Sequence, residues 1–318
     1  MLLYRRYLTN QGEKKTMSYE TKIIKMPFVF TTEEQNKNVT ELTLKEAYFD
    51  YINSRSSILS PSTIKNYYVY QRNSFPDLMF LKLSELKETN IQVAVNRYAL
   101  NHSPKTVRNA FSLLHAVVST YRPDFSMNIT LPKKVKPKYV IPTTREIGKL
   151  IARADDKIKL PILLACQGGL RRSEISALTP NDFSLFGVNI NKAVVYDKNN
   201  NLVVKTTKTV SSDRFVPLPP AVIKEANRYQ YFGLTPAEIS SGYDRLISHC
   251  NIPYFSYHKL RHFFASELHA NGIPDQYIAK VGGWSSLNVL QNIYEHTLRD
   301  KQEEFEQQIT KVFTENFG

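Results

Sequence analysis

The stretch that decides the fold runs from Ser256 to Thr297 and has the sequence SYHKLRHFFASELHANGIPDQYIAKVGGWSSLNVLQNIYEHT. It begins with a His-x-x-Arg pair, His258 and Arg261, whose side chains share one face of a helix because they are one turn apart. The glycine-tryptophan turn GGWS, at positions 282–285, separates this pair from Tyr294. One short part of the chain therefore holds a histidine, an arginine and a tyrosine around a sharp turn.

The composition is that of a globular protein with an excess of positive charge. The 318 residues suffice for two domains with separate cores, and hydrophobic and charged shares of 42% and 22% are ordinary. A net charge of +13 and a pI near 9.5 indicate a polyanionic partner. We find no basic amphipathic helix with a wide apolar face, so nucleic acid is favoured over a membrane. Charge alone leaves open a merely basic surface.

The cysteines and the hydropathy indicate the compartment. Cys166 and Cys250 lie far apart and lack metal-ligand spacing, as is typical of proteins in a reducing cytoplasm. No apolar run reaches the roughly 18 residues of a membrane span. Residues 1–7 are too short and too basic for a signal peptide. We expect a cytoplasmic protein that is associated with the nucleoid and not with a membrane.

Residues 41–130 predict a compact bundle of about four helices. Residues 42–56, LTLKEAYFDYINSRS, repeat apolar side chains at steps of three and four. Ser60-Pro61 and Ser103-Pro104 each combine a serine N-cap with a proline at the first helical position. Residues 1–40 have no clear periodicity, and we assign them no fold.

A basic linker is expected between this bundle and a second domain. The sequence LPKKVKPK contains four lysines, two prolines and almost nothing to bury, which is typical of an extended segment. We place the linker at residues 131–140 and the second domain at residues 141–318. The linker lysines that we expect to contact DNA are Lys133, Lys134, Lys136 and Lys138.

The second domain is predicted to be helical with one small antiparallel β-sheet. The β-branched runs Ala193–Tyr196 and Leu202–Thr206 flank the turn DKNNN, and Arg214–Pro217 forms a third short strand. The helical period then resumes and ends in the charged tail RDKQEEFEQQITKVF. The predicted fold class is therefore mainly α with a small antiparallel β-sheet.

The candidate chemistry is cleavage of a phosphodiester by direct attack. This reaction requires a nucleophile, donors that stabilise the charged transition state, and an acid for the leaving oxygen. We find no paired carboxylates of the kind that bind catalytic metals, so side chains would supply the positive charge without a metal or another cofactor. Arg171 follows a Gly-Gly break, and its planar fork suits a phosphate, although Arg172 could serve equally. Glu174 shares the helix face of Arg171 and could orient its guanidinium.

The acid and the nucleophile have several candidates. Lys208 lies on a hairpin from which it could protonate the departing oxygen, and Lys205 is its rival. A tyrosine nucleophile has a free pKa near 10, and surrounding cations favour its phenolate. Among 19 tyrosines, Tyr294 follows the glycine turn, but Tyr257 and Tyr277 also remain candidates on chemistry alone.

Together and in this order, these elements resemble the tyrosine recombinase (phage integrase) family. The matching pieces are GGLRRSEISAL, the hairpin lysine before SSDRFVPL, HKLRHFFAS, and GGWSS followed by Tyr294 and His296. The resemblance covers residues 139–300, and extends less specifically to residues 41–130. It implies an N-terminal helical core-binding (SAM-like) domain and a C-terminal mixed α/β catalytic domain of the DNA breaking-rejoining type.

The resemblance also implies a role for each matching residue. Arg171 and Arg261 would clamp the phosphate, and Lys208 would act as general acid. His258 would assist proton transfer at Tyr294, which would attack the phosphate and form a 3′-phosphotyrosyl link. This covalent intermediate conserves bond energy, so neither ATP nor a metal is needed.

Trp284 departs from the common family pattern. It occupies the position at which most members have a second histidine. Its indole N–H can donate a hydrogen bond but cannot shuttle a proton. A role in packing alone is therefore an alternative for Trp284.

The implied function is site-specific recombination of double-stranded DNA at specific recombination sites. The implied assembly is a homotetramer on DNA, with accessory DNA-bending factors left open. Residues 1–40 are too short and irregular for the arm-site-binding domain of larger integrases, so a simpler recombinase fits better. Two alternatives use the same fold: a topoisomerase IB-like enzyme that nicks and reseals DNA, and a non-catalytic architectural DNA-binding protein.

Overall fold

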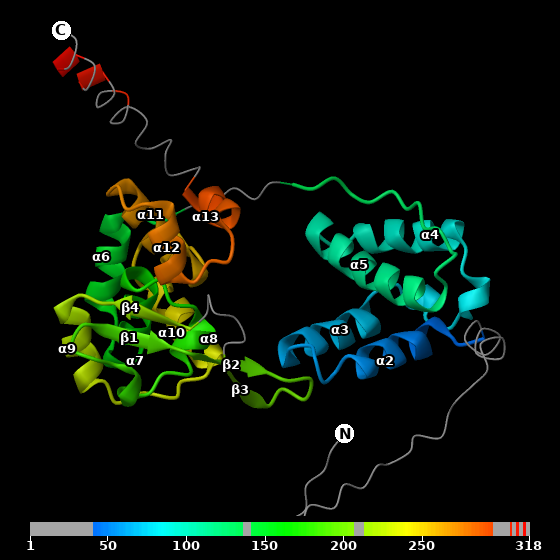
Figure 1. Ribbon diagram of the computed structural model, residues 1–318, viewed down its shortest axis with the longest axis horizontal. Coiled ribbons are helices and arrows are strands. Elements are labelled where there is room, and N and C mark those ends of the chain that lie inside the picture. Colours follow the sequence, from blue (N-terminus) through cyan, green and yellow to red (C-terminus); the bar gives the residue numbers. More distant parts are fainter. Residues whose placement is uncertain are drawn as a thin grey trace, which may run out of the picture.

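The protein is represented by a computed structural model that describes residues 41–135, 141–206 and 213–294, with five positions of the C-terminal tail. Its elements gather in an N-terminal lobe (residues 41–135) and a C-terminal lobe (residues 141–206 and 213–294), as Figure 1 shows. Residues 1–40, for which no fold was predicted, lie outside the described part. Within the described ranges, no helix is both long and apolar enough to cross a bilayer.

The N-terminal lobe contains four α-helices, as predicted. Its described helices are α2 (Leu44–Ser54), α3 (Pro61–Asn73), α4 (Glu88–Ala99) and α5 (Pro104–Tyr121), with 3₁₀ turns at Pro76–Leu78 and Leu83–Glu85. The predicted caps are present: Ser60 Oγ accepts from the Thr63 amide at 3.3 Å, and Ser103 Oγ from the Thr106 amide at 3.2 Å. The prolines after both serines occupy the first helical turn, where a missing N–H has no cost.

This lobe has a hydrophobic core of its own. All four helices contribute to it, with Leu44, Ile64, Ile91 and Leu114 among the buried side chains. α5 provides the widest apolar face, because its buried positions recur at steps of three and four over the whole helix. The helices of this lobe therefore bury their apolar faces against one another.

The C-terminal lobe is organised around a buried helix. Its described helices are α6 (Thr144–Arg153), α7 (Asp156–Gln167), α8 (Arg172–Ile175), α9 (Pro220–Arg228), α10 (Pro236–Ser248), α11 (His258–Ala270), α12 (Asp275–Gly282) and α13 (Leu287–Tyr294), with a 3₁₀ turn at Pro180–Asp182. α7 is the KLPILLACQ segment that is apolar all round, and it packs against α6, α9, α10 and α11. A helix without a polar face needs neighbours on every side, which places α7 at the centre of the lobe.

The strands are short and antiparallel, as predicted, but they form two ladders. β1 (Gly187–Ile190) pairs with β4 (Arg214–Pro217), and β2 (Lys192–Tyr196) pairs with β3 (Leu202–Thr206). Asn191 separates β1 from β2, and the chain between β3 and β4 lies outside the described residues. The β1–β4 register sets Arg214 opposite Ile190 and so fixes where this arginine enters the lobe.

The β2–β3 hairpin contacts the N-terminal lobe at α3 (Figure 1). Lys65 Nζ donates to Asn200 Oδ1 at 2.6 Å and lies 4.9 Å from the centre of the Tyr196 ring. From the hairpin, Lys198 Nζ lies 5.5 Å from the centre of the Tyr68 ring. The two lobes have separate hydrophobic cores. The division into two domains with a linker at residues 131–140 stays a prediction.

The core of the N-terminal lobe offers a direct test of this packing. Leu114 is completely buried, so Leu114→Ala should lower the free energy of unfolding by about 2–5 kcal/mol. Leu100, which is 81% exposed at the end of α4, provides the matched control. Leu100→Ala should change the free energy of unfolding by less than about 0.5 kcal/mol. Urea unfolding followed by circular dichroism measures both, and equal effects would contradict the assigned core.

Candidate active site

Three arginines converge on the C-terminal end of α12. The carbonyls of residues 281–283 are consecutive, and each accepts a hydrogen bond from a different guanidinium. The last carbonyls of a helix have no intrahelical partner and carry the negative end of its dipole, so they attract cations. The bonds run from Arg214 Nε to Val281 O (2.7 Å), from Arg261 Nη1 to Gly282 O (2.5 Å), and from Arg171 Nη2 to Gly283 O.

The two glycines of the GGWS turn are required by close contacts. Gly283 has φ +71°, the left-handed conformation that often ends a helix, and a Cβ there would lie 2.9 Å from Arg214 Nη1. At Gly282 a Cβ would lie 1.8 Å from the ring of Trp284. The turn therefore leaves room for one guanidinium and one indole at positions where any side chain would displace them.

Glu174 is a buried carboxylate that binds two of these arginines. Its carboxylate is 3% exposed and accepts from the amide and Nη1 of Arg171, at 2.8 and 2.7 Å, and from both Nη atoms of Arg214, at 3.1 and 2.9 Å. Burial alone would raise the pKa of Glu174, but the hydrogen bonds and charge of Arg214 and the charge of Arg171 outweigh it and lower the pKa. The predicted orienting contact between Glu174 and Arg171 is thus present, and the carboxylate is ionised.

Arg261 is almost completely buried, with a residue exposure of 2%. Its Nη1 donates to the carbonyls of Gly169 and Gly282, and its guanidinium lies 3.8 Å from the centre of the Trp284 ring. In the described part of the chain, its Nη2 is buried without a hydrogen-bond partner. Burial and the charge of Arg171 lower the pKa of Arg261 to about 8, which still leaves it mostly protonated at neutral pH.

His258 is the first residue of α11, one turn before Arg261 as predicted. The residue is exposed at the surface. The centre of its ring lies 4.9 Å from the centre of the His262 ring, in an edge-to-face arrangement. Desolvation by the chain packed around the ring, with the charges of Arg261 and Arg171, lowers the pKa of His258 to about 4. The imidazole is therefore neutral near pH 7 and able to accept a proton.

Tyr294 is the last residue of α13, a helix that packs against α11 and α12. Leu290 and Ile293 anchor the helix there, with exposures of 0% and 3%. The helix that ends at Tyr294 therefore lies next to α11, which begins with His258, and next to α12, which ends two residues before Trp284. Its side chain lies outside the described part of the structure.

The rival tyrosines occupy different environments. Tyr257 is buried, and its hydroxyl donates to the Pro161 carbonyl at 2.6 Å, so it is not available to a substrate. Burial raises its pKa further. Tyr277 is 62% exposed on α12 and makes a convenient control for Tyr294.

The remaining predicted residues lie either away from the arginine cluster or outside the described residues. Arg172 donates to Ser240 Oγ on α10 and not to the carbonyls that hold the cluster. Lys205, the rival of Lys208, is half-buried on β3 opposite Ala193. Lys133 and Lys134 are exposed in the segment after α5. Lys208, His296, Lys136 and Lys138 lie outside the described residues.

Arg214 is the cluster member that the sequence did not single out. It occupies a strand start in RFVP, a context that gives no sign of a buried carboxylate nearby. Its place in the cluster follows from the pairing of β4 with β1, which sets Arg214 opposite Ile190, and this register is known only from the fold.

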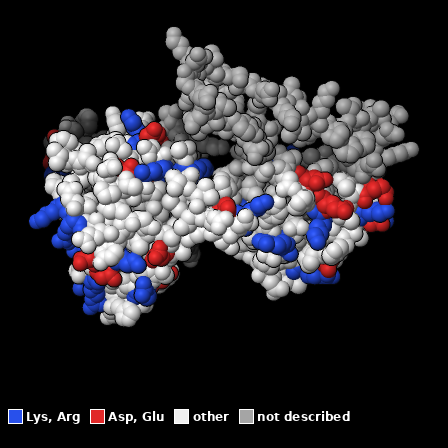
Figure 2. Space-filling model, turned by 90° about the horizontal axis from the view of Figure 1, so that it is seen from below, with Lys and Arg blue, Asp and Glu red and all other residues white. Residues whose placement is uncertain are grey.

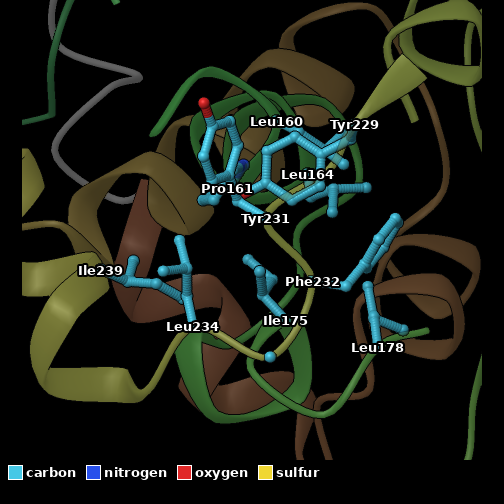
Figure 3. Close-up of a pocket in the computed structure, with 11 residues that line it drawn as sticks. Leu160, Pro161, Leu164, Ile175, Leu178, Tyr229, Tyr231, Phe232, Leu234 and Ile239 are labelled. Carbon is cyan, nitrogen blue, oxygen red and sulfur yellow. The ribbon is translucent and has the colours of Figure 1, made fainter. Parts of the chain in front are cut away.

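An apolar pocket in the same lobe is separate from the arginine cluster. It lies beside α7 and α8 and is lined by aliphatic and aromatic side chains (Figure 3). None of the predicted site residues lines this pocket. Its lining residues include Leu160, Leu164, Ile175, Tyr229 and Phe232.

Comparison with known proteins shows which proteins this chain resembles. Residues 234–301 match the model of the phage integrase family. A curated relative, the XerC-like tyrosine recombinase of Caldanaerobacter subterraneus subsp. tengcongensis, is 25% identical in an alignment 292 positions long, and the match covers 75% of this chain and 75% of the relative. Residues 234–301 are therefore similar to the phage integrase family, and the relative that aligns with most of the chain is a tyrosine recombinase.

Solved structures show the same fold over most of the chain. The Tn1549 transposon integrase in complex with transposon right end DNA matches with a TM-score of 0.68 at 18% identity, covering 85% of this chain and all of that one. A lambda integrase dimer bound to a COC′ core site matches with a TM-score of 0.58 at 14% identity, covering 85% and 82%. The mainly α fold with few antiparallel strands is thus confirmed.

The glycine turn can be tested by two alanine substitutions. Gly283→Ala should lower the free energy of unfolding by at least about 1–2 kcal/mol, because alanine resists a positive φ and its Cβ meets Arg214. Gly148→Ala in α6 is the control: a Cβ there has no atom within 4 Å, and the change should stabilise the protein by about 0.5–1 kcal/mol. Thermal unfolding of both variants measures the difference, and a stable Gly283→Ala protein would refute the strained turn.

Proposed function

We propose that the protein is a site-specific DNA recombinase that cleaves and rejoins strands through a 3′-phosphotyrosyl intermediate on Tyr294. The observation that carries this proposal is the cluster of Arg171, Arg214 and Arg261 at the end of α12. Together with the family, this cluster supports an anionic substrate and a tyrosine nucleophile.

The charge of the cluster favours a bound phosphate. The cluster contains three guanidinium groups and one carboxylate, Glu174, which binds Arg171 and Arg214, so this set of residues carries an excess of two positive charges at neutral pH. Buried positive charge without a counterion is costly. Arg171 has 36% of its side chain exposed, and Nη2 of Arg261 has no acceptor among the residues that the structure describes. Two oxygens of a scissile phosphate would satisfy both requirements.

The proposed reaction begins with attack of the Tyr294 hydroxyl on the phosphorus. The tyrosine proton passes to a base, for which His258 is the candidate because its imidazole is neutral near pH 7 and has a free lone pair. The bond from phosphorus to the 5′ oxygen breaks, and Lys208 donates a proton to that oxygen, as in the family. A 5′-hydroxyl from a partner duplex then attacks the phosphotyrosyl link, which releases Tyr294 and exchanges the strands.

The arginines would stabilise the negative charge that develops during this step, and the tryptophan would exclude water from one of them. Arg171 and Arg261 stabilise the negative charge that develops on the nonbridging oxygens. Trp284 covers the guanidinium of Arg261 and excludes water from it, which strengthens the electrostatic contact with the phosphate. This role requires neither a proton shuttle at Trp284 nor a cofactor.

Duplex DNA would be held by both lobes. Lysine and arginine side chains occur on both lobes of the face seen in Figure 2, interspersed with acidic residues. Lys133 and Lys134 in the connecting segment are exposed and available for phosphate contacts, and Lys136 and Lys138 continue the same run. The structural neighbours bound to DNA support this arrangement. We place the reaction on the cytoplasmic nucleoid, in a homotetramer whose assembly accessory DNA-bending proteins could assist.

The test is trapping of a covalent complex on a suicide DNA substrate that carries a nick near the cleavage point. The wild-type protein should form an adduct that resists denaturing electrophoresis. Tyr294→Phe should form none, because it lacks the attacking oxygen. Tyr277→Phe should retain the wild-type yield, since Tyr277 is exposed on another helix.

The possible outcomes separate the three candidate functions. Transfer of the bound strand to a partner duplex supports the recombinase. An adduct that is resealed only to its own strand favours a topoisomerase IB-like enzyme. DNA binding without any adduct favours an architectural protein, and an adduct that survives in Tyr294→Phe assigns the nucleophile to another residue.

Phosphate contacts by the linker predict a change in salt dependence. The double substitution Lys133→Gln, Lys134→Gln should reduce the slope of log K against log salt by roughly 2, because two fewer counterions are released. Lys224→Gln, at an exposed position on α9, should leave the slope unchanged. Fluorescence anisotropy at several salt concentrations measures these slopes, and equal slopes for all three proteins would remove these lysines from the interface.

A further inference from the structure

We propose that Arg214 is a positioning residue for DNA cleavage, which holds the phosphate-binding Arg171 in place through Glu174 and through the end of α12. This inference rests on the proposed function, since it assigns Arg171 to the scissile phosphate. It concerns the member of the arginine cluster whose Nε and both Nη atoms all donate to groups inside the protein.

Burial separates Arg214 from the other candidate phosphate ligand. Its side chain is 4% exposed, against 36% for Arg171. Its Nη atoms face the two oxygens of Glu174, and its Nε faces the Val281 carbonyl. With these hydrogen bonds inside the protein, Arg214 acts on DNA only through the groups that it holds.

Arg214 fixes the position of Arg171 by two routes. Through Glu174, it orients the carboxylate that accepts from the amide and Nη1 of Arg171. Through Val281, it holds the last turn of α12, whose Gly283 carbonyl accepts from Nη2 of the same arginine. Both ends of the Arg171 fork therefore depend on contacts that Arg214 makes.

The geometry also explains why arginine is needed at this position. The planar guanidinium presents a pair of parallel donors to Glu174 while its Nε points to a third acceptor. Lysine carries the same charge, but its single nitrogen cannot span the two carboxylate oxygens and the Val281 carbonyl in one fixed plane. Arg214→Lys therefore preserves the positive charge but removes the fixed planar arrangement of the three donors.

The experiment compares Arg214→Lys and Arg214→Gln with the wild-type protein in single-turnover cleavage of the suicide substrate. We expect the cleavage rate to fall roughly 10-fold in Arg214→Lys and roughly 100-fold in Arg214→Gln, the scale of a displacement near 1 Å. DNA affinity and its salt slope should stay within about 2-fold, because Arg214 does not reach the phosphates. A loss in rate at saturating DNA, without a loss in affinity, distinguishes positioning from general damage to the fold.

A matched control is available in the same lobe. Arg228 also pairs with a buried carboxylate three residues before it, Glu225, but at the end of α9. Arg228→Gln should keep the wild-type cleavage rate. A comparable loss in this variant would show that removal of any ion pair in the lobe slows cleavage, and would overturn the inference.

The coupling between the two arginines gives a second criterion. If Arg214 acts through Arg171, the double variant Arg171→Ala, Arg214→Gln should cleave no more slowly than Arg171→Ala alone. Multiplicative losses would show that Arg214 contributes independently, which contradicts a positioning role.

Trp284 supplies a readout that needs no catalysis. It is the single tryptophan of the chain, and its ring covers the guanidinium of Arg261 within the turn that Arg214 anchors. Displacement of the turn in Arg214→Lys should change the intensity and the emission maximum of its fluorescence, whereas Arg228→Gln should not. An unchanged spectrum together with unchanged cleavage would overturn the inference.

This design keeps the two proposals apart. If the wild-type protein forms no adduct, the proposed function fails, while the fluorescence still tests whether Arg214 anchors the turn. If the wild-type protein cleaves and Arg214→Gln, folded by circular dichroism, cleaves within 2-fold of it, only the positioning role fails. Should Arg214→Gln not fold, the conservative Arg214→Lys variant decides.

Discussion

The end of α12 is the constraint on which the candidate site depends. A helix that stops at a buried position leaves carbonyl groups that need donors, and here three arginines from different parts of the chain provide them. These arginines come from the start of α8, the start of β4 and the first turns of α11. Satisfying one helix end thus gathers into one place the positive charge that a phosphodiester reaction requires.

Gathering three arginines in one place costs electrostatic free energy, because their charges repel one another. Three features of the site reduce this cost. Glu174 offsets part of the charge, the dipole of α12 offsets more, and the Trp284 ring covers the buried guanidinium of Arg261. What remains is a net positive centre, which favours an anionic ligand. Desolvation, together with the charges of Arg261 and Arg171, lowers the pKa of His258 and keeps its imidazole neutral near pH 7.

Much of the fold could be predicted from the sequence, because its signals are local. The caps Ser60 and Ser103 and the apolar period of α5 depend only on neighbours within a few residues, and all are present. The pairing of β4 with β1 could not be predicted, since register between distant strands depends on tertiary packing.

The candidate site divides in the same way. His258 and Arg261 are one turn apart on a helix, so their proximity follows from spacing alone. Arg214 was missed because its importance comes from Glu174, 40 positions earlier, and a contact of that kind leaves no periodic trace. The role of Gly282 was also hidden, since the sequence indicates a turn but not the indole that packs on it.

The attachment of α13 has a consequence for motion. α13 is held by Leu290 and Ile293 in a small cluster with Ala265, Ile278 and Ala279, apart from the main core of the lobe. Releasing two such side chains costs about 3–6 kcal/mol, at or below the lower end of the roughly 5–15 kcal/mol of global unfolding. We therefore expect local opening of α13 to require less free energy than global unfolding. The helix that ends at Tyr294, the proposed nucleophile, is thus attached to the lobe through apolar contacts that differ from the hydrogen bonds that hold the arginines.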